Sequence, residues 1–163
     1  MTRSSTAVAS AFRLLGAVAL CFSAAAIGSA ATLPAIPTWY AGLDKPAFTP
    51  PNAVFGPVWT LLYLLMALVL WRLFEAPAGP ARRRALTAFL VQLVLNAAWS
   101  VAFFGLHSPA AGLAVILPLW LAIAWTIAAA RPVVGRWSLA LAPYLAWVSY
   151  AVALNVGVLL LND

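Results

Sequence analysis

Four long stretches of this chain carry no charged side chain, and their lengths restrict the fold more than any motif does. They cover residues 14–43, 46–71, 85–130 and 137–162. A helix needs about 20 apolar residues to cross about 30 Å of hydrocarbon. Because 66% of the 163 residues are hydrophobic and 7% are charged, a soluble domain of this size could not bury the apolar surface. The sequence therefore predicts an integral membrane protein.

The third uncharged stretch is too long for one span and predicts a hairpin. It contains GLHSP at 105–109, which combines turn-forming and helix-breaking residues. Backbone groups in lipid must bond internally, and the alternation typical of a membrane barrel is absent. We therefore predict one all-α domain over 1–163, a bundle of five transmembrane helices at about 11–33, 53–74, 84–105, 109–130 and 138–160.

The placement of the basic residues predicts an orientation. In a five-span layout all eight arginines fall on the N-terminal side of the membrane, and only Lys45 falls on the other. The positive-inside rule then places the N-terminus in the cytoplasm and the C-terminus outside, which favours the inner membrane of a bacterium. The net charge of +6 is better explained by anionic lipid headgroups than by nucleic acid.

The first apolar segment has a second interpretation. Arg3 and Arg13, the apolar run after them and the small residues at 28–31 also fit a secretion signal with its cleavage site. Cleavage would leave four spans and the same orientation. Cys21 has no second cysteine with which to form an internal disulfide.

The connection 34–52 holds five prolines and an aromatic cluster. Proline fixes φ and restricts the residue before it, so this loop loses less entropy on ordering than a flexible one. With Trp39, Tyr40 and Phe48 beside Pro50 and Pro51, it suits a lid over the bundle. An interfacial aromatic belt explains the same composition equally well. Asp44 and Lys45 are expected to stay solvated at its rim.

Three spans each show a face with large aromatic side chains, and in two of them amide and small residues share that face. The faces are Phe55, Trp59, Tyr63 and Met66; Gln92, Asn96, Trp99 and Ser100; and Tyr144, Trp147, Ala151 and Asn155. Polar residues inside a membrane usually face the bundle interior or a cavity. Interhelical hydrogen bonding and ring packing are the alternative to a ligand pocket, and spacing alone leaves both open.

The sequence lacks the residues that proton relays, metal sites and conventional enzyme active sites need. No carboxylate or lysine lies deep in a span, so a proton relay has no evident parts. His107 has no Cys, Asp or Glu nearby, so no metal site is expected. No phosphate-binding loop, dinucleotide fingerprint or nucleophile–base arrangement is present. We therefore expect no conventional enzyme and no required cofactor.

Four segments together resemble one known family. WYAGLDKPAFTPPNAVFGPVWTLLY (39–63), QLVLNAAWSVAFF (92–104) and PYLAWVSYAVALNVGVLLLN (143–162) are similar to motifs of the TspO/MBR family. This family includes the tryptophan-rich sensory proteins of bacteria and the mitochondrial translocator protein, or peripheral benzodiazepine receptor. AIGSAATLPAIP (26–37) resembles the end of the family's first helix, which argues against a discarded signal peptide.

The resemblance implies a five-helix bundle, often dimeric, that binds porphyrins and, in some members, sterols or drug-like ligands beneath the first outer loop. By matching motif positions, the ligand-binding residues are expected to be Tyr40, Phe55, Trp59, Tyr63, Asn96, Ser100, Trp147 and Ala151. The family's sterol pattern needs a basic residue soon after a tyrosine. None follows Tyr150, which lowers the expectation of sterol binding. Phe48 stands where many members have tryptophan.

Four functions follow from this resemblance and remain open at this stage. The leading hypothesis is a receptor that binds protoporphyrin-like tetrapyrroles and acts in tetrapyrrole metabolism or stress response. A second is an enzyme that degrades porphyrin in light and oxygen through Trp59 and Trp147. A third is a transporter of porphyrin or another lipophile, although paired halves with broken helices are absent. The fourth is a structural partner without a ligand.

Overall fold

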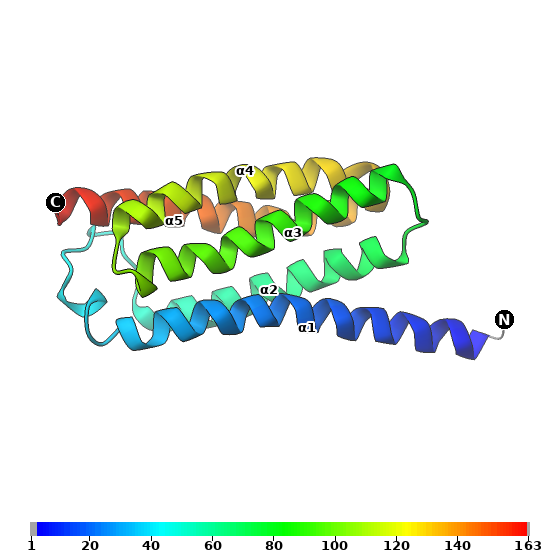
Figure 1. Ribbon diagram of the computed structural model, residues 1–163, viewed down its shortest axis with the longest axis horizontal. Helices are drawn as coiled ribbons and strands as arrows, with labels where there is room; N and C mark the ends of the chain where they lie inside the picture. Colours follow the sequence, from blue (N-terminus) through cyan, green and yellow to red (C-terminus); the bar gives the residue numbers. More distant parts are fainter. Residues whose placement is uncertain (1–2, 163) are drawn as a thin grey trace.

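The chain forms a bundle of long helices that run side by side (Figure 1). The computed structural model describes residues 3–162, with side chains from residue 6 on, so the ends of the predicted domain lie outside the described residues. Its helices are α1 (Arg3–Ala35), α2 (Asn52–Glu75), α3 (Pro80–Ser100), α4 (Pro109–Val134) and α5 (Ala142–Leu161). No strand occurs between residues 3 and 162, as predicted. The bounds of α2 to α5 lie within about five residues of the predicted spans, whereas α1 begins eight residues before its predicted start at residue 11.

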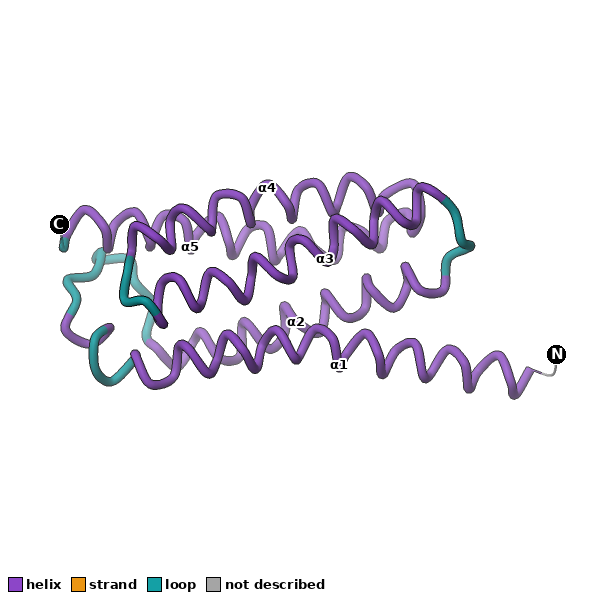
Figure 2. Tube along the Cα trace, viewed as in Figure 1, coloured by secondary structure: helices purple, strands orange, loops and turns teal. Residues whose placement is uncertain are grey.

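The number of separate membrane-spanning segments differs from the prediction. Among the described residues, four uninterrupted helical segments are long and apolar enough to cross a membrane, where the sequence predicted five. The fourth is Pro109–Leu161, with 53 residues, because the expected loop after α4 is itself a 3₁₀ turn, Gly135–Leu141, that leads directly into α5. Gly135 has φ of +59°, a left-handed conformation that glycine adopts without steric cost, and it ends α4. Figures 1 and 2 show α4 and α5 folded back side by side.

The packing of α2 differs from that of the other helices. It lies closely along α1, whereas α3 packs between α1 and α4, and α4 packs on α5. The space between α2 and the helices α3 and α5 is filled by aromatic side chains. Trp59 contacts Trp99 and Tyr144 at ring-centroid distances of 6.2 Å each, and Phe55 contacts Trp147 at 5.9 Å. Large rings between widely spaced backbones leave room for a cavity.

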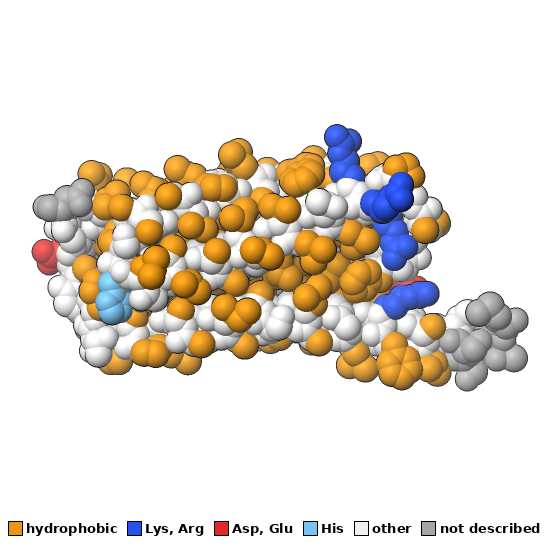
Figure 3. All heavy atoms as spheres, viewed as in Figure 1, with side chains coloured by type: hydrophobic (Ala, Val, Ile, Leu, Met, Phe, Trp, Pro, Cys, Tyr) orange, Lys and Arg blue, Asp and Glu red, His pale blue; other side chains and the backbone are white. Residues whose placement is uncertain are grey.

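The two ends of the bundle differ in charge. The described arginines lie at the end formed by the C-terminus of α2, the N-terminus of α3 and the turn after α4, whereas Lys45 lies in the α1–α2 connection at the other end. On the face seen in Figure 3, the Lys and Arg side chains all gather near the N-terminus. Apolar side chains cover the length between the ends, as expected for a surface that faces lipid.

Candidate ligand cavity

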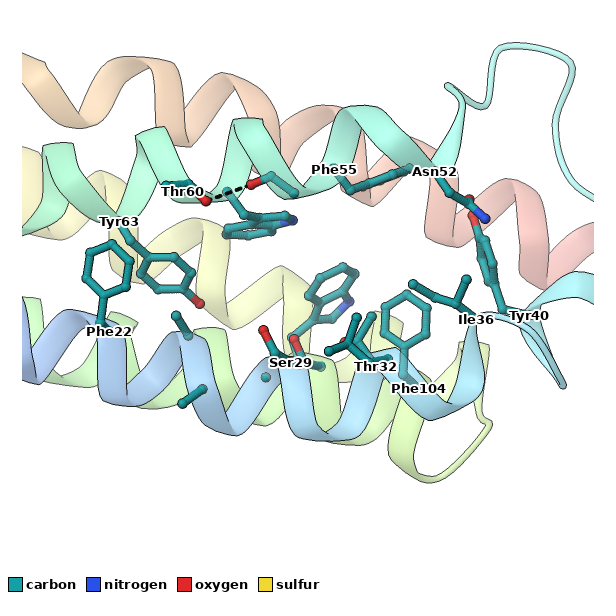
Figure 4. A pocket seen from close by; sticks show the side chains of 18 of the residues that line it. Phe22, Ser29, Thr32, Ile36, Tyr40, Asn52, Phe55, Thr60, Tyr63 and Phe104 are labelled. Atoms are coloured by element: carbon teal, nitrogen blue, oxygen red, sulfur yellow. Dashed lines mark hydrogen bonds between the residues drawn. The ribbon is translucent and has the colours of Figure 1, made fainter.

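A cavity of about 600 Å³ lies between α1, α2 and the end of α3, near the α1–α2 connection (Figure 4). Its size is that of a typical small-molecule site. Six aromatic side chains from four elements line it beside Tyr40: Phe22, Phe55, Trp59, Tyr63, Trp99 and Phe104. The polar groups are hydroxyls and one amide, from Ser29, Thr32, Thr60, Ser100 and Asn52. No charged side chain belongs to this lining, so the cavity suits a flat and largely apolar ligand.

The α1 wall is built from small residues. A Cβ atom added to Gly28 would lie 3.0 Å from Ser100 Oγ, so α1 and α3 approach closely at this point. The cavity occupies the space beside the small side chains of Ala25, Ala26 and Ser29. Sequence reasoning gave α1 no ligand role. The available signal was the segment 24–31, in which every residue except Ile27 is alanine, glycine or serine, because small residues mark sites of close helix approach.

Five of the eight predicted ligand-binding residues line the cavity: Tyr40, Phe55, Trp59, Tyr63 and Ser100. The expectation that Asn96, Trp147 and Ala151 also line it is not met by the geometry. Trp147 packs edge-on against Phe55 and so stands one side chain away from the cavity, while Ala151 is buried in the core. Trp99 of α3 lines the cavity, and Trp147 does not, because the Trp99 side chain reaches the interior between α1 and α2.

Asn96 holds three helices together beneath the cavity. Its Oδ1 accepts a hydrogen bond from the Tyr63 hydroxyl at 2.5 Å, and its Nδ2 donates to the Tyr144 hydroxyl at 2.9 Å. The Asn96 side chain is 1% exposed, so these bonds have no competition from solvent. The interhelical hydrogen bonds expected of this residue are therefore present.

Replacement of Asn96 by leucine should leave the hydroxyls of Tyr63 and Tyr144 without their partners. A buried polar group that loses its partner costs about 1–3 kcal/mol, so we expect Asn96→Leu to lower the free energy of unfolding by about 2 kcal/mol or more. Thermal unfolding in detergent measures this. A double-mutant cycle with Tyr144→Phe should show strong non-additivity, and additive effects would contradict the network.

A π-helical turn shapes the wall at the end of α3. Residues Val101–Gly105 form this wider turn, which directs two successive rings inward: Phe103 is buried, and Phe104 lines the cavity. Trp99 Nε1 donates to Asn155 Oδ1 at 3.3 Å, and Asn155 Nδ2 donates to the Pro109 carbonyl at 2.7 Å. These bonds fix the Trp99 ring against the cavity.

The α1–α2 connection is fastened to α5. Asn162 accepts from the Asp44 backbone N–H at 3.0 Å and donates to the Asp44 carbonyl at 2.9 Å. Pro46 packs on the bare backbone of Gly157, where an added Cβ would lie 2.3 Å from Pro46 Cγ. The Phe48 carbonyl accepts from the Tyr150 hydroxyl. The connection is thus a docked cap and not a free loop.

The residues predicted as a lid have different positions in this cap. Trp39 stacks on His107 at 4.9 Å and meets Phe103 edge-on at 5.5 Å. Phe48 is exposed and contacts the Tyr150 ring at 6.2 Å, while Pro50 and Pro51 lead into α2 without lining the cavity. Only Tyr40 of this segment's aromatics lines the cavity.

Two polar side chains of the cap have structural explanations. Lys45 Nζ donates to the Leu43 carbonyl at 2.7 Å and lies 5.0 Å from the centre of the Tyr40 ring. Burial, and then the charge of a Tyr150 phenolate, raise the pKa of Tyr40, so its phenol stays neutral at physiological pH. Because Lys45 is bonded to the cap backbone and lies over the ring, it positions Tyr40 at the outer end of the cavity.

Replacement of Gly157 by alanine should release the cap from α5. Because the new methyl group would overlap the Pro46 ring, the segment 41–50 must move away. We expect amide hydrogen exchange in 41–50 to accelerate by about tenfold or more, while the helices stay protected. Gly42→Ala is the matched control, since no atom lies within 4 Å of its added Cβ. Equal exchange in both variants would show that Pro46 does not hold the cap.

These features define a class of protein: a helical membrane protein with an aromatic-lined cavity inside the bundle. The profile of the TspO/MBR family matches residues 17–161. The chain belongs to the TspO/MBR family.

Relatives from distant organisms agree with this assignment. The chain is 47% identical over 135 residues to the tryptophan-rich protein TspO of Archaeoglobus fulgidus, covering 83% of this chain and 87% of that protein. It is 39% identical over 152 residues to the tryptophan-rich protein TspO of Chlorobaculum tepidum, covering 89% of this chain and 92% of that protein. It is 36% identical over 119 residues to the human translocator protein, covering 72% of this chain and 70% of that protein.

Proposed function

We propose that this protein is a membrane receptor that binds a porphyrin of the protoporphyrin type in the cavity and acts in tetrapyrrole metabolism or stress response. The observation that carries the proposal is the ring-lined cavity of about 600 Å³ without a charged lining residue. A planar macrocycle gains both apolar burial and ring stacking in such a site.

The arrangement of the rings supports a flat ligand. Trp59 and Trp99 lie 6.2 Å apart with an angle of 31° between their planes, and Trp59 and Tyr63 lie 5.8 Å apart at 35°. Rings inclined at shallow angles form walls against which another ring system can stack. Each aromatic pair contributes about 0.5–1.5 kcal/mol beyond its area burial.

In this proposal the ligand enters the cavity sideways, from the bilayer. The cap is fastened to α5 and places the buried Tyr40 at the outer end of the cavity. Ser29 and Leu33 of α1 and Thr60 of α2 line the cavity and are also exposed, Leu33 by 65%. A lipophilic ligand dissolved in the membrane would reach the site between α1 and α2 without displacing the cap.

Tryptophan fluorescence tests the proposal. We expect micromolar protoporphyrin IX to quench the emission of the purified protein saturably, and Trp59→Ala to weaken the apparent affinity by about tenfold. Trp125→Ala is the control, because this half-exposed residue of α4 lies outside the cavity lining. Absence of saturable quenching in the wild type would end the proposal.

A second candidate function is the degradation of bound porphyrin in light and oxygen. It is favoured by the two tryptophans in the lining, Trp59 and Trp99, which place oxidisable rings beside the ligand. Illumination of the loaded protein in air should bleach the porphyrin spectrum faster than that of free porphyrin. The Trp59→Phe, Trp99→Phe double variant should lose this acceleration, and Trp147→Phe should keep it. Bleaching at the rate of free porphyrin would contradict this candidate.

The proposed setting is the inner membrane of a bacterium, with the N-terminus in the cytoplasm and a homodimer as the assembly. We propose five crossings, because the segment Pro109–Leu161 folds back on itself at Gly135–Leu141. In intact cells an impermeant thiol reagent should label Lys45→Cys and not Arg136→Cys. Cys21 is buried and gives little background. The reverse pattern would invert the orientation, and light scattering in detergent measures the oligomeric state.

A further inference from the structure

A second hollow, of about 430 Å³, lies at the opposite end of the bundle from the ligand cavity. Ala78, Gly79, Arg82, Arg83 and Leu86 line it, where the connection after α2 enters α3. Two of these five residues are arginines, so the hollow differs in chemistry from the uncharged aromatic cavity.

One of the two arginines is already held in position. Arg82 Nε donates to the Leu73 carbonyl at 2.8 Å, and its Nη2 donates to the Phe74 carbonyl at 3.4 Å. Both carbonyls belong to the last turn of α2, the negative end of its helix dipole. The guanidinium group is therefore ordered before any ligand arrives, which reduces the entropy lost on binding.

This end of the bundle carries an excess of positive charge. Among the described side chains it holds Arg13, Arg72, Arg82, Arg83, Arg84, Arg131 and Arg136. Glu75 is the acidic residue of this end in the described part, and it is paired with Arg13 at 3.1 Å. The first turn of α3 contains no acidic side chain, although a helix N-terminus favours negative charge.

Arg83 is the arginine that lacks a protein partner within the hollow. In the described part of the chain no hydrogen bond, ion pair or ring contact engages its exposed guanidinium group. Arg82, by contrast, is bonded to α2, and Arg72 lies 4.4 Å from the centre of the Trp137 ring. Arg83 is thus free to contact an anion in the hollow.

An apolar stripe on α3 continues from the hollow along the membrane-facing surface. Leu86, Leu90 and Val94 follow Arg83 at spacings of three, four and four residues, which puts them on one helix face. Leu90 is 45% exposed and Val94 is 68% exposed. A cationic hollow that continues into an exposed apolar stripe matches a lipid headgroup and its acyl chain.

We propose that this hollow binds the phosphate group of an anionic phospholipid, with an acyl chain along Leu86, Leu90 and Val94. Arg83 forms the charge-assisted hydrogen bonds to the phosphate, and the ordered Arg82 supplies a second positive charge at the floor. Charge complementarity selects a lipid with net negative charge over a zwitterionic one. The site is independent of any porphyrin in the aromatic cavity.

Native mass spectrometry of the full-length protein tests the proposal. The protein would be released from nanodiscs containing equal amounts of phosphatidylglycerol and phosphatidylcholine, and the retained lipids would be counted. We expect selective retention of one phosphatidylglycerol and about a fivefold loss of retention in Arg83→Gln. Arg84→Gln is the matched control, because it removes the same charge from the next residue, which does not line the hollow.

Further measurements distinguish a specific lipid site from non-specific attraction of anionic lipid to the basic end, and from binding of inorganic phosphate. Equal retention by the Arg83→Gln and Arg84→Gln variants, or no preference for phosphatidylglycerol, would overturn the proposal. Inorganic phosphate should leave the lipid in place at 10 mM, a concentration on the order of the dissociation constant of a weak anion site. Displacement of the lipid by phosphate would assign the hollow to a free anion instead. Leu90→Asn should weaken retention without a change of charge, which tests the acyl-chain contact, and circular dichroism confirms that each variant is folded.

Discussion

Gly112→Val should produce the largest loss of stability of any substitution considered for this protein. A Cβ added to Gly112 would lie 2.7 Å from Phe103 Cδ2 and 2.8 Å from Asn155 Oδ1. The valine must therefore displace the π-helical turn and Asn155, whose amide holds Trp99 and the Pro109 carbonyl. Overpacking and the lost hydrogen bonds together should lower the free energy of unfolding by about 2–4 kcal/mol.

Thermal unfolding of the detergent-purified protein measures this effect, with Gly105→Ala as the control. The nearest atoms to an added Cβ at Gly105 lie at 3.6 Å, which is ordinary contact. Alanine is also the better helix former, so the control should keep or slightly raise the unfolding temperature. A valine at position 112 that unfolds at the wild-type temperature would show that α4 does not press on the π-helical turn.

Gly56→Phe should weaken the proposed porphyrin binding by about tenfold to a hundredfold while the fold is kept. Gly56 lines the aromatic cavity, and no atom lies within 4 Å of an added Cβ. A phenyl ring at this position would occupy space that the proposed porphyrin needs, while its Cβ would meet no neighbouring atom within 4 Å. Overpacking by a ring costs about 1–3 kcal/mol, which corresponds to a loss of affinity of about tenfold to a hundredfold.

The fluorescence titration with protoporphyrin IX measures this loss, with Gly16→Phe as the matched control. Gly16 is also a helical glycine with open space around it, but it lies in α1 outside the cavity lining. The control should bind as the wild type does. If both variants bind normally, the ligand site lies elsewhere, whereas if both lose binding, the loss comes from a general effect of the added ring.

The positions of the helices could be predicted because the membrane imposes a length scale on the sequence. Charged residues cannot lie deep in hydrocarbon, so Arg72 and the arginines 82–84 bracket a turn between two spans. The turn between α4 and α5 was harder to predict. Arg131 and Arg136, which end two uncharged stretches, suggested a loop, but the chain stays helical there and reverses through a 3₁₀ turn after Gly135.

The lining of the cavity was predicted in part, and the differences have a common cause. Spacing identifies which residues share a helix face, and it identified Phe55, Trp59 and Tyr63 correctly as one wall. It does not say how far that face lies from the faces of other helices. Asn96 therefore proved to be a hydrogen-bonded tie, Trp147 lies behind Phe55, and the opposite wall comes from α1.

The sequence by itself determined the membrane character, the approximate positions of the helices and the family, because each depends on hydrophobicity and local motifs along the chain. The tertiary structure alone decided where the cavity lies. Its position depends on the close approach of α1 and α3 at Gly28 and on the wide spacing of α2. The docking of Pro46 on Gly157 is likewise a contact between distant segments. Distances between helices arise from the packing of all side chains together, and no single segment encodes them.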